Sequence, residues 1–259
     1  MIRFMLFGLI REVNMKIAFC LHGLVGTTDK YGIGKKEIPY KIGYKHYKEH
    51  VFDKNDDLDI FIHTWSHHHH DGIEELYKPK AIKSEPPPNF DIPDLDGNLD
   101  KIKKARLYAI KCKWKSYKTV IDMVKESGNV YDWVFVTRFD LAFSTDFCFD
   151  KYDNTRFYAQ GPPGPVQNGF QLINDLWYFT NQEDMEVFGD LYSHLDQEPY
   201  RTLESNHELE RLHLQKTGLQ NKLEYIFRRD WTPGKASKMT TETPLVRWVY
   251  FEGGDRGFT

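Results

Sequence analysis

Short, almost unbroken apolar runs separated by amphipathic stretches restrict the folds open to this chain. Residues 16–21 (KIAFCL), 58–64 (LDIFIHT) and 133–137 (WVFVT) are rich in strand-forming residues. Such continuous apolar character is typical of strands buried on both faces, as in parallel sheets. Parallel neighbours need a crossover connection, usually a helix. We therefore expect an α/β fold with a Rossmann-like, mainly parallel sheet flanked by helices.

The segments between these runs have helical spacing. Tyr40 to Val51 places apolar residues on one stripe with lysines between them, and the same pattern extends from about Asp100 to Ser127, where Gly128 ends it. Further on, the pattern predicts strands over 157–160 and 172–180 and helices over 183–195 and 205–216.

Two segments are expected to be irregular. Residues 78–98 are rich in Pro, Asp and Asn, and residues 161–169 (GPPGPVQNG) contain three prolines and three glycines. Proline lacks the backbone donor that regular elements need. We expect the first segment to contain no regular element and the second to be a mobile loop.

Composition narrows the classes of protein. The 259 residues are 40% apolar, which suits one domain over 1–259, and 35 basic residues against 38 acidic ones give no field that would attract nucleic acid. Three cysteines without CxxC spacing favour a reducing compartment, which we expect to be the cytoplasm. The opening run MIRFMLFGLI is too short for a membrane span, so we interpret residues 1–14 as an N-terminal extension and Met15 as the start of the functional chain.

Polar residues follow three of the predicted strands. They are His22 and Gly23 after the first, His63, Thr64 and Trp65 after the second, and Arg138 and Asp140 after the third. In open parallel sheets, ligands bind beyond the carboxyl ends of the strands. The shared position predicts one ligand site at this edge.

These motifs resemble a known family. KIAFCLHG, LDIFIHTW and YDWVFVTRFDLAF, followed by NDLWYFTNQEDMEVFGDLY, are similar in order and spacing to the GT-A-like glycosyltransferases of bacteria, algae and large DNA viruses, including WavE-like proteins. The likeness covers residues 16 to about 216. One difference is that Leu24, Val25 and Gly26 stand where the family commonly has an arginine after the opening glycine.

The resemblance implies a GT-A fold whose residues 15–145 bind a UDP- or GDP-sugar and whose residues 146–259 bind a glycan or related acceptor. It implies donor-binding roles for His22, Gly23, His63, Thr64, Trp65 and Arg138. Asp140, with His207 from a later helix, would hold Mn²⁺ or Mg²⁺, hard ions that suit carboxylate and phosphate oxygens. Arg138 replaces the first acid of the usual Asp-x-Asp pair. The alternative is that Arg138 and Asp140 form a buried ion pair that organises the edge of the sheet and binds no metal.

Asp175 is the candidate catalytic base. It lies in the apolar run LINDLWYFT, where a charge is costly unless it is paired or useful. Burial would raise its pKa toward values useful for deprotonating an acceptor hydroxyl. A turn-capping role after Asn174 is the alternative.

Other polar residues have simpler explanations. Consecutive histidines from His67 to His70 cannot all face one ion, so we expect a solvated loop there. His207 and Glu208, near a helix start in SNHELE, are candidates to reach the site, and a helix cap formed by Ser205 or Asn206 with Glu208 is the alternative. Trp65 fits the core as well as sugar stacking.

The sequence is compatible with three functions. The first is a metal-assisted glycosyltransferase, and the second is a noncatalytic sugar- or nucleotide-binding module of the same fold. The third, a nucleotidyltransferase, lacks the expected glycine-rich run with following basic residues.

Overall fold

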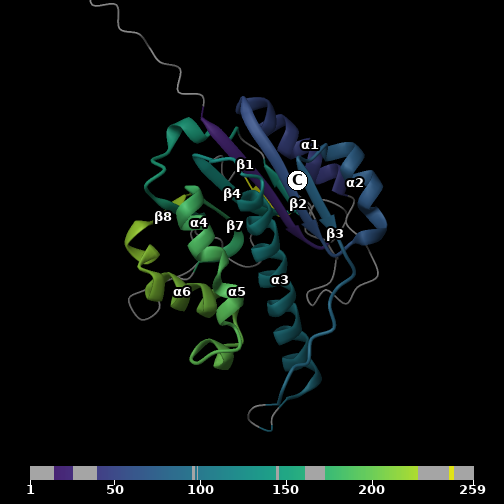
Figure 1. Ribbon diagram of the computed structural model, residues 1–259, viewed down its shortest axis with the longest axis vertical. Coiled ribbons are helices and arrows are strands. Elements are labelled where there is room, and N and C mark those ends of the chain that lie inside the picture. Colours follow the sequence, from purple (N-terminus) through teal and green to yellow (C-terminus); the bar gives the residue numbers. More distant parts are fainter. Residues whose placement is uncertain are drawn as a thin grey trace, which may run out of the picture.

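The computed structural model describes residues 15–25, 40–94, 97, 99–143, 146–160, 173–226 and 245–247. Within these ranges, seven strands form one sheet in the order β3-β2-β1-β4-β7-β6-β8 (Figure 1). Its strands are β1 (Lys16–Gly23), β2 (Asp57–Thr64), β3 (Ala81–Ser84), β4 (Trp133–Arg138), β6 (Phe157–Gln160), β7 (Asn174–Thr180) and β8 (Leu223–Ile226). A separate antiparallel pair joins β5 (Leu141–Phe143) to β9 (Leu245–Arg247).

The sheet is mostly parallel, as the apolar runs predicted. Strands β3, β2, β1 and β4 pair in parallel, and β6 pairs in parallel with β8. Only β7 runs against its neighbours, between β4 and β6. The α/β, Rossmann-like fold is therefore confirmed, with one sheet continuous through both halves of the sequence.

Helices cover both faces of this sheet. They are α1 (Tyr40–His50), α2 (His70–Tyr77), α3 (Lys101–Glu126), α4 (Gln182–Gly189), α5 (Leu191–His194) and α6 (Asn206–Thr217). Short 3₁₀ turns lie at η1 (Phe52–Lys54), η2 (His67–His69), η3 (Phe149–Lys151), η4 (Tyr200–Thr202) and η5 (Leu219–Lys222).

Each face of the sheet has its own apolar core. One core joins β-strand residues such as Cys20 and Val136 to α3 and to the α4–α6 group, which lies beside α3 in Figure 1. The other joins Phe19 and Phe135 to α1, α2 and the segment 139–149. Alternation along β1 explains the division, because successive side chains of a strand point to opposite faces.

Helix α3 is the longest element and reaches past the sheet. Its 26 residues correspond to about 39 Å, whereas strands of eight residues span only about 26 Å. The side chain of Asp100 caps its first turn by accepting a hydrogen bond from Lys103 N at 2.7 Å, and Gly128 beyond its end has φ +69°. In Figure 1 the N-terminal half of α3 projects beyond the strands.

The structure corrects three sequence-based expectations. Residues 78–98 do contain a regular element, β3, because a short edge strand pairs only with β2 before the prolines begin. Residues 183–195 form two helices, α4 and α5, that meet at Asp190. Residues 67–70 are a 3₁₀ turn leading into α2 rather than a loop, although His67 and His68 remain exposed.

The described helices and cysteines add two findings. In the described ranges, no helix combines the length and apolar character that a membrane crossing requires. Cys20, Cys112 and Cys148 form no disulfide. Residues 161–169 and 1–14 lie outside the described residues.

Candidate functional site

The three polar motifs meet at one edge of the sheet. Strand register places His22 opposite His63 on one side and opposite Arg138 on the other, and pairs Gly23 with Thr64. The residues come from separate parts of the sequence, yet they share the carboxyl ends of β1, β2 and β4. The parallel pairing of these strands is what brings them together.

Gly23 lies at the end of this row and is partly exposed. Its φ of +94° is a left-handed value that favours glycine, and among the described residues a Cβ added there would meet no atom within 4 Å. The described residues therefore leave space in front of the backbone at the end of β1. His22, one residue earlier, is 5% exposed, and its Nδ1 atom has no hydrogen-bond partner among the described residues.

His63 is held by a buried polar network. Ser116 of α3 accepts a hydrogen bond from Gly23 N at 2.8 Å, and its hydroxyl lies 2.6 Å from His63 Nδ1. His63 Nε2 lies 3.3 Å from a carboxylate oxygen of Glu85. This arrangement fits a neutral imidazole that accepts at Nδ1 and donates at Nε2. Burial lowers the pKa of His63 to about 4, so the ring is neutral at physiological pH.

The side chains of Thr64 and Trp65 are buried in the protein rather than exposed at the edge of the sheet. Thr64 is fully buried, and its hydroxyl accepts a hydrogen bond from Ser66 N. Trp65 is 3% exposed, packs edge-on against His63 with ring centroids 4.5 Å apart, and donates to the Cys112 carbonyl. These contacts are those of core residues that support the edge.

Arg138 and Asp140 form a two-pronged ion pair directly after β4. Arg138 Nε and one terminal nitrogen donate to the two Asp140 oxygens at 2.8 and 2.7 Å. The Asp140 side chain is 3% exposed, whereas that of Arg138 is 26% exposed. The hydroxyl of Tyr47 in α1 donates to the Arg138 carbonyl. The pair is therefore rigidly seated, with the arginine reaching the surface.

Asp175 faces α3 because β7 is irregular. It lies three residues before Tyr178, which packs in the α3 core, so a regular strand would place it on the opposite face. A register shift opposite Ala159 and Gln160 changes that alternation. Asp175 Oδ2 accepts a hydrogen bond from Lys113 Nζ at 3.3 Å.

The surroundings of Asp175 set its charge. Burial acts to raise its pKa, but the positive charges of Lys113 and Arg138, helped by His207, outweigh burial and hold the pKa below its usual range. The expectation that burial would raise this pKa is therefore wrong, because the cations were not visible from the sequence. The turn-capping alternative is not observed either, since the side chain forms an ion pair with Lys113.

Lys113 also bonds a second acid, Glu210 of α6. The Lys113 Nζ to Glu210 Oε1 distance is 2.7 Å, and the Glu210 side chain is fully buried. Burial raises the pKa of Glu210 despite the adjacent ammonium group. Asn206 of the same helix donates to Asp175 Oδ2 at 3.4 Å and accepts from Trp114 Nε1 at 3.1 Å. The two neighbouring acids are thus pushed toward different protonation states.

The start of α6 differs from the predicted cap. Ser205 occupies the N-cap position but makes no side-chain capping hydrogen bond, and Asn206 points to Asp175 and Trp114 instead. The capping interpretation of SNHELE is therefore wrong. His207 Nδ1 donates to the Ile173 carbonyl at 2.6 Å, which leaves Nε2 as the other ring nitrogen.

Few of the described residues are placed to bind the predicted metal ion. In the part of the chain that the structure describes, no group of three or more His, Cys, Asp or Glu residues is placed to hold a metal ion. Both Asp140 oxygens already bond Arg138, and the Asp140 side chain is only 3% exposed. Mg²⁺ is commonly held by one or two carboxylates together with substrate phosphates and waters. Asp140 has the carboxylate chemistry of such a site, and a metal bound there would share this carboxylate with Arg138.

Sequence reasoning missed three residues of this cluster, Lys113, Ser116 and Glu210, and gave Asn206 only a capping role. A signal existed in α6, because residues 206, 210 and 213 lie on one helical face and are all polar although two of them are buried. In α3, Ser116 is likewise a polar residue within a buried, otherwise apolar stripe. Polar residues on the otherwise apolar face of a helix were therefore the sequence signal that was overlooked.

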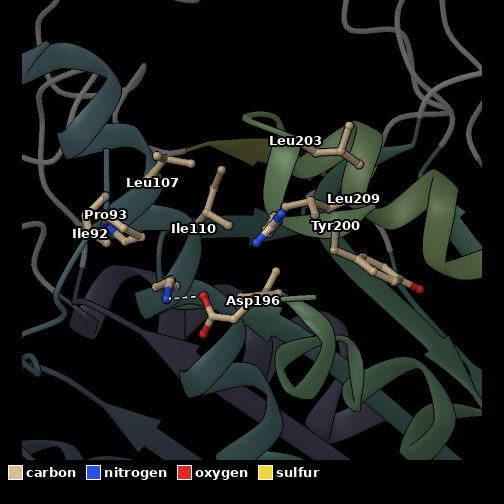
Figure 2. A pocket seen from close by; sticks show the side chains of 11 residues that line it. Ile92, Pro93, Leu107, Ile110, Asp196, Tyr200, Leu203 and Leu209 are labelled. Atoms are coloured by element: carbon tan, nitrogen blue, oxygen red, sulfur yellow. Dashed lines mark hydrogen bonds and ion pairs between the residues drawn. The ribbon is translucent and has the colours of Figure 1, made fainter. Parts of the chain in front are cut away.

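A small apolar pocket lies where α3 projects beyond the sheet, and its lining residues Ile110 and Leu209 belong to the same two helices as Lys113 and Glu210. Figure 2 shows its two walls, with Asp196 and its ion pair to Lys111 at the side. None of the predicted site residues lines it. The lining residues are Ile92, Pro93, Leu107, Ile110, Lys111, Leu195, Asp196, Tyr200, Arg201, Leu203 and Leu209.

A scan against protein-family models and a search of curated proteins both returned no match for this chain.

Proposed function

We propose that the protein is a glycosyltransferase that moves a sugar from a UDP- or GDP-sugar to a hydroxyl of a glycan or related acceptor, assisted by Mn²⁺ or Mg²⁺, in the cytoplasm. The observation that carries the proposal is the meeting of Arg138, Asp140 and Asp175 at one carboxyl edge. Arg138 bonds Asp140, and its charge acts on Asp175. The cation suits a reaction with an anionic leaving group, and the lowered pKa keeps Asp175 ionised, so that it can accept a proton although it is a weaker base than a carboxylate with a raised pKa.

In this proposal Asp175 is the base. Its carboxylate takes the proton of the acceptor hydroxyl while the acceptor oxygen forms a bond to the anomeric carbon. The bond from that carbon to the diphosphate breaks, and the nucleoside diphosphate leaves with its electrons. Arg138 lies beside this site with an exposed portion that can meet the departing phosphate.

Asp140 would hold the metal, whose chemistry is to neutralise charge on the diphosphate. His207 would add a nitrogen ligand through Nε2. The space that the described residues leave at Gly23 supports donor binding at the end of β1, and buried His22 would act by supporting that end. The buried residues His63, Thr64 and Trp65 would act by shaping that end.

A noncatalytic sugar- or nucleotide-binding module is the second candidate. The two-pronged Arg138–Asp140 ion pair favours it, because an arginine bonded to both carboxylate oxygens opposes a cation at the same place. Such a module would bind donor through Arg138 without needing metal.

A panel of nucleotide sugars, each with and without Mn²⁺, tests the proposal. Melting temperature reports binding, since a ligand that binds only the native state stabilises it. Release of nucleoside diphosphate in the same samples reports chemistry. A Mn²⁺-dependent melting shift with diphosphate release supports the transferase, a shift without release supports the binding module, and no shift with any donor contradicts both.

A further inference from the structure

Lys113 links three elements beneath the carboxyl edge. Its ammonium group comes from α3, bonds Asp175 of β7 at 3.3 Å and bonds Glu210 of α6 at 2.7 Å. The Lys113 side chain is only 12% exposed, and its nitrogen lies 4.9 Å from the centre of the Trp114 ring. A lysine enclosed in this way has little freedom to move.

The two oxygens of Asp175 have different surroundings. Oδ2 accepts hydrogen bonds from both Lys113 and Asn206. Among the described residues, no hydrogen bond reaches Oδ1. The contacts therefore fix one oxygen and leave the other able to accept a proton.

We infer that Lys113 is a positioning residue that holds the Asp175 carboxylate so that Oδ1 faces the acceptor hydroxyl. The inference rests on the proposed transferase function. Lys113 does not touch the reacting atoms in this scheme; it acts through Asp175. Removing the ammonium group would leave Asn206 as the remaining described donor to Oδ2, at a distance of 3.4 Å.

A purely structural role for Lys113 is the competing explanation. Glu210 is fully buried, and an unpaired buried charge is strongly destabilising. Lys113→Met alone could therefore fail to fold because of Glu210. Glu210→Gln removes that difficulty, since the amide is neutral and keeps nearly the same shape.

The experiment compares Glu210→Gln with Lys113→Met/Glu210→Gln in the full chain. Lys118→Met is the matched control, since Lys118 lies on the same helix and pairs with exposed Asp122. We expect the double variant to lose about 10²-fold in kcat relative to Glu210→Gln, as misplaced catalytic groups do. The donor Kd should stay within about twofold, because the loss belongs to the chemical step. Lys113→Arg/Glu210→Gln should recover most of the rate. Equal rates for Glu210→Gln and the Lys113→Met double variant would overturn the inference.

A readout without activity separates this inference from the proposed function. The ¹³C resonance of the Asp175 carboxyl, assigned with Asp175→Asn, should move between Glu210→Gln and the double variant. An unchanged resonance would overturn the positioning role whether or not the protein transfers sugar. A moved resonance in a protein that transfers from no donor would uphold the Lys113–Asp175 contact and overturn the transferase proposal.

Discussion

Asp175 and Glu210 share one lysine, yet their surroundings push them in opposite directions. The pKa of Asp175 is lowered by Lys113 and Arg138, whereas burial raises that of Glu210. Pairs of carboxyl groups separated in this way are a recognised arrangement for acid–base work. At the scale of single residues, the site therefore consists of one ionised acid near the surface and one buried acid behind it.

Asp175→Asn tests the ionised acid. The amide keeps the size of the side chain and one acceptor but cannot take a proton, so we expect transfer to fall by about 10²–10⁴-fold. Donor affinity, measured by calorimetry, should persist because the donor is bound by other groups. Asp196→Asn serves as the control, since Asp196 is exposed and pairs with Lys111 of α3, the helix that also carries Lys113. Wild-type transfer by folded Asp175→Asn would remove Asp175 from the mechanism.

Asp140→Asn tests the metal ligand. The neutral amide removes the negative charge that both Arg138 and a divalent ion need, so Mn²⁺-dependent binding of a UDP-sugar should disappear in calorimetry. We expect the fold to persist with a loss of about 1.5–3 kcal/mol, the range for hydrogen bonds to charged groups. Exposed Asp122 provides the matched Asp122→Asn control. Undiminished Mn²⁺-dependent affinity would place the metal elsewhere.

At the scale of elements, helix α1 positions the turn that carries Arg138 and Asp140. Tyr47 donates to the Arg138 carbonyl, and a Cβ on Gly43 would lie 2.5 Å from the Phe139 carbonyl oxygen. The helix backbone thus approaches the turn as closely as glycine alone permits.

Gly43→Ala should push helix α1 away from the turn that carries Arg138 and Asp140. Alanine gains about 1 kcal/mol in helix propensity, but overpacking against a backbone oxygen costs about 1–3 kcal/mol. We expect a lower free energy of unfolding in urea and weaker Mn²⁺-dependent donor binding. Lys45→Ala, on the exposed side of α1, is the control. A more stable Gly43→Ala protein would show that α1 is not held against Phe139.

The elements themselves were largely predictable, and the reason lies in burial. Strands β1 and β4 and the second half of β2 are buried on both faces, so their apolar residues carry the strand signal. The edge strand β3 was missed because AIKS has only one neighbour and little apolar content. The short β3 pairing is set by contact with β2 rather than by its own sequence.

The site was predictable in position but not in its connections. Parallel strands alone imply that His22, His63 and Arg138 meet at one edge. The partners of Asp175 come from α3 and α6, which are distant in sequence, and a strand irregularity turns Asp175 toward them. Such tertiary contacts leave no local spacing to read.

At the scale of the whole molecule, buried histidines link the fold to pH. His22, His63 and His213 are each at most 5% exposed, and burial lowers the pKa of each. Because the neutral rings are favoured only in the folded state, their stabilisation is complete above the unfolded pKa of about 6.5 and is lost as the pH falls.

His213 allows this acid sensitivity to be measured with least disturbance of the proposed site. Its Nε2 lies 3.0 Å from the Val187 carbonyl and its Nδ1 lies 3.0 Å from the Tyr200 hydroxyl, away from Asp140 and Asp175. Burial lowers its pKa to about 4. Between pH 7 and pH 5 the unfolded chain takes up the proton and the folded one does not. One such histidine therefore costs about 2 kcal/mol of stability over that interval.

We expect His213→Gln to lose about 2 kcal/mol less than wild type between pH 7 and pH 5, because glutamine supplies a donor and an acceptor but does not titrate in this range. Urea unfolding at each pH measures the difference. Glu210 acts in the opposite direction, since its raised pKa favours the folded state at lower pH, but it is present in both proteins and cancels. Exposed His67 gives the control His67→Gln, which should follow wild type. If His213→Gln and wild type lost stability in parallel, the buried ring of His213 would have to take up its proton within the folded protein.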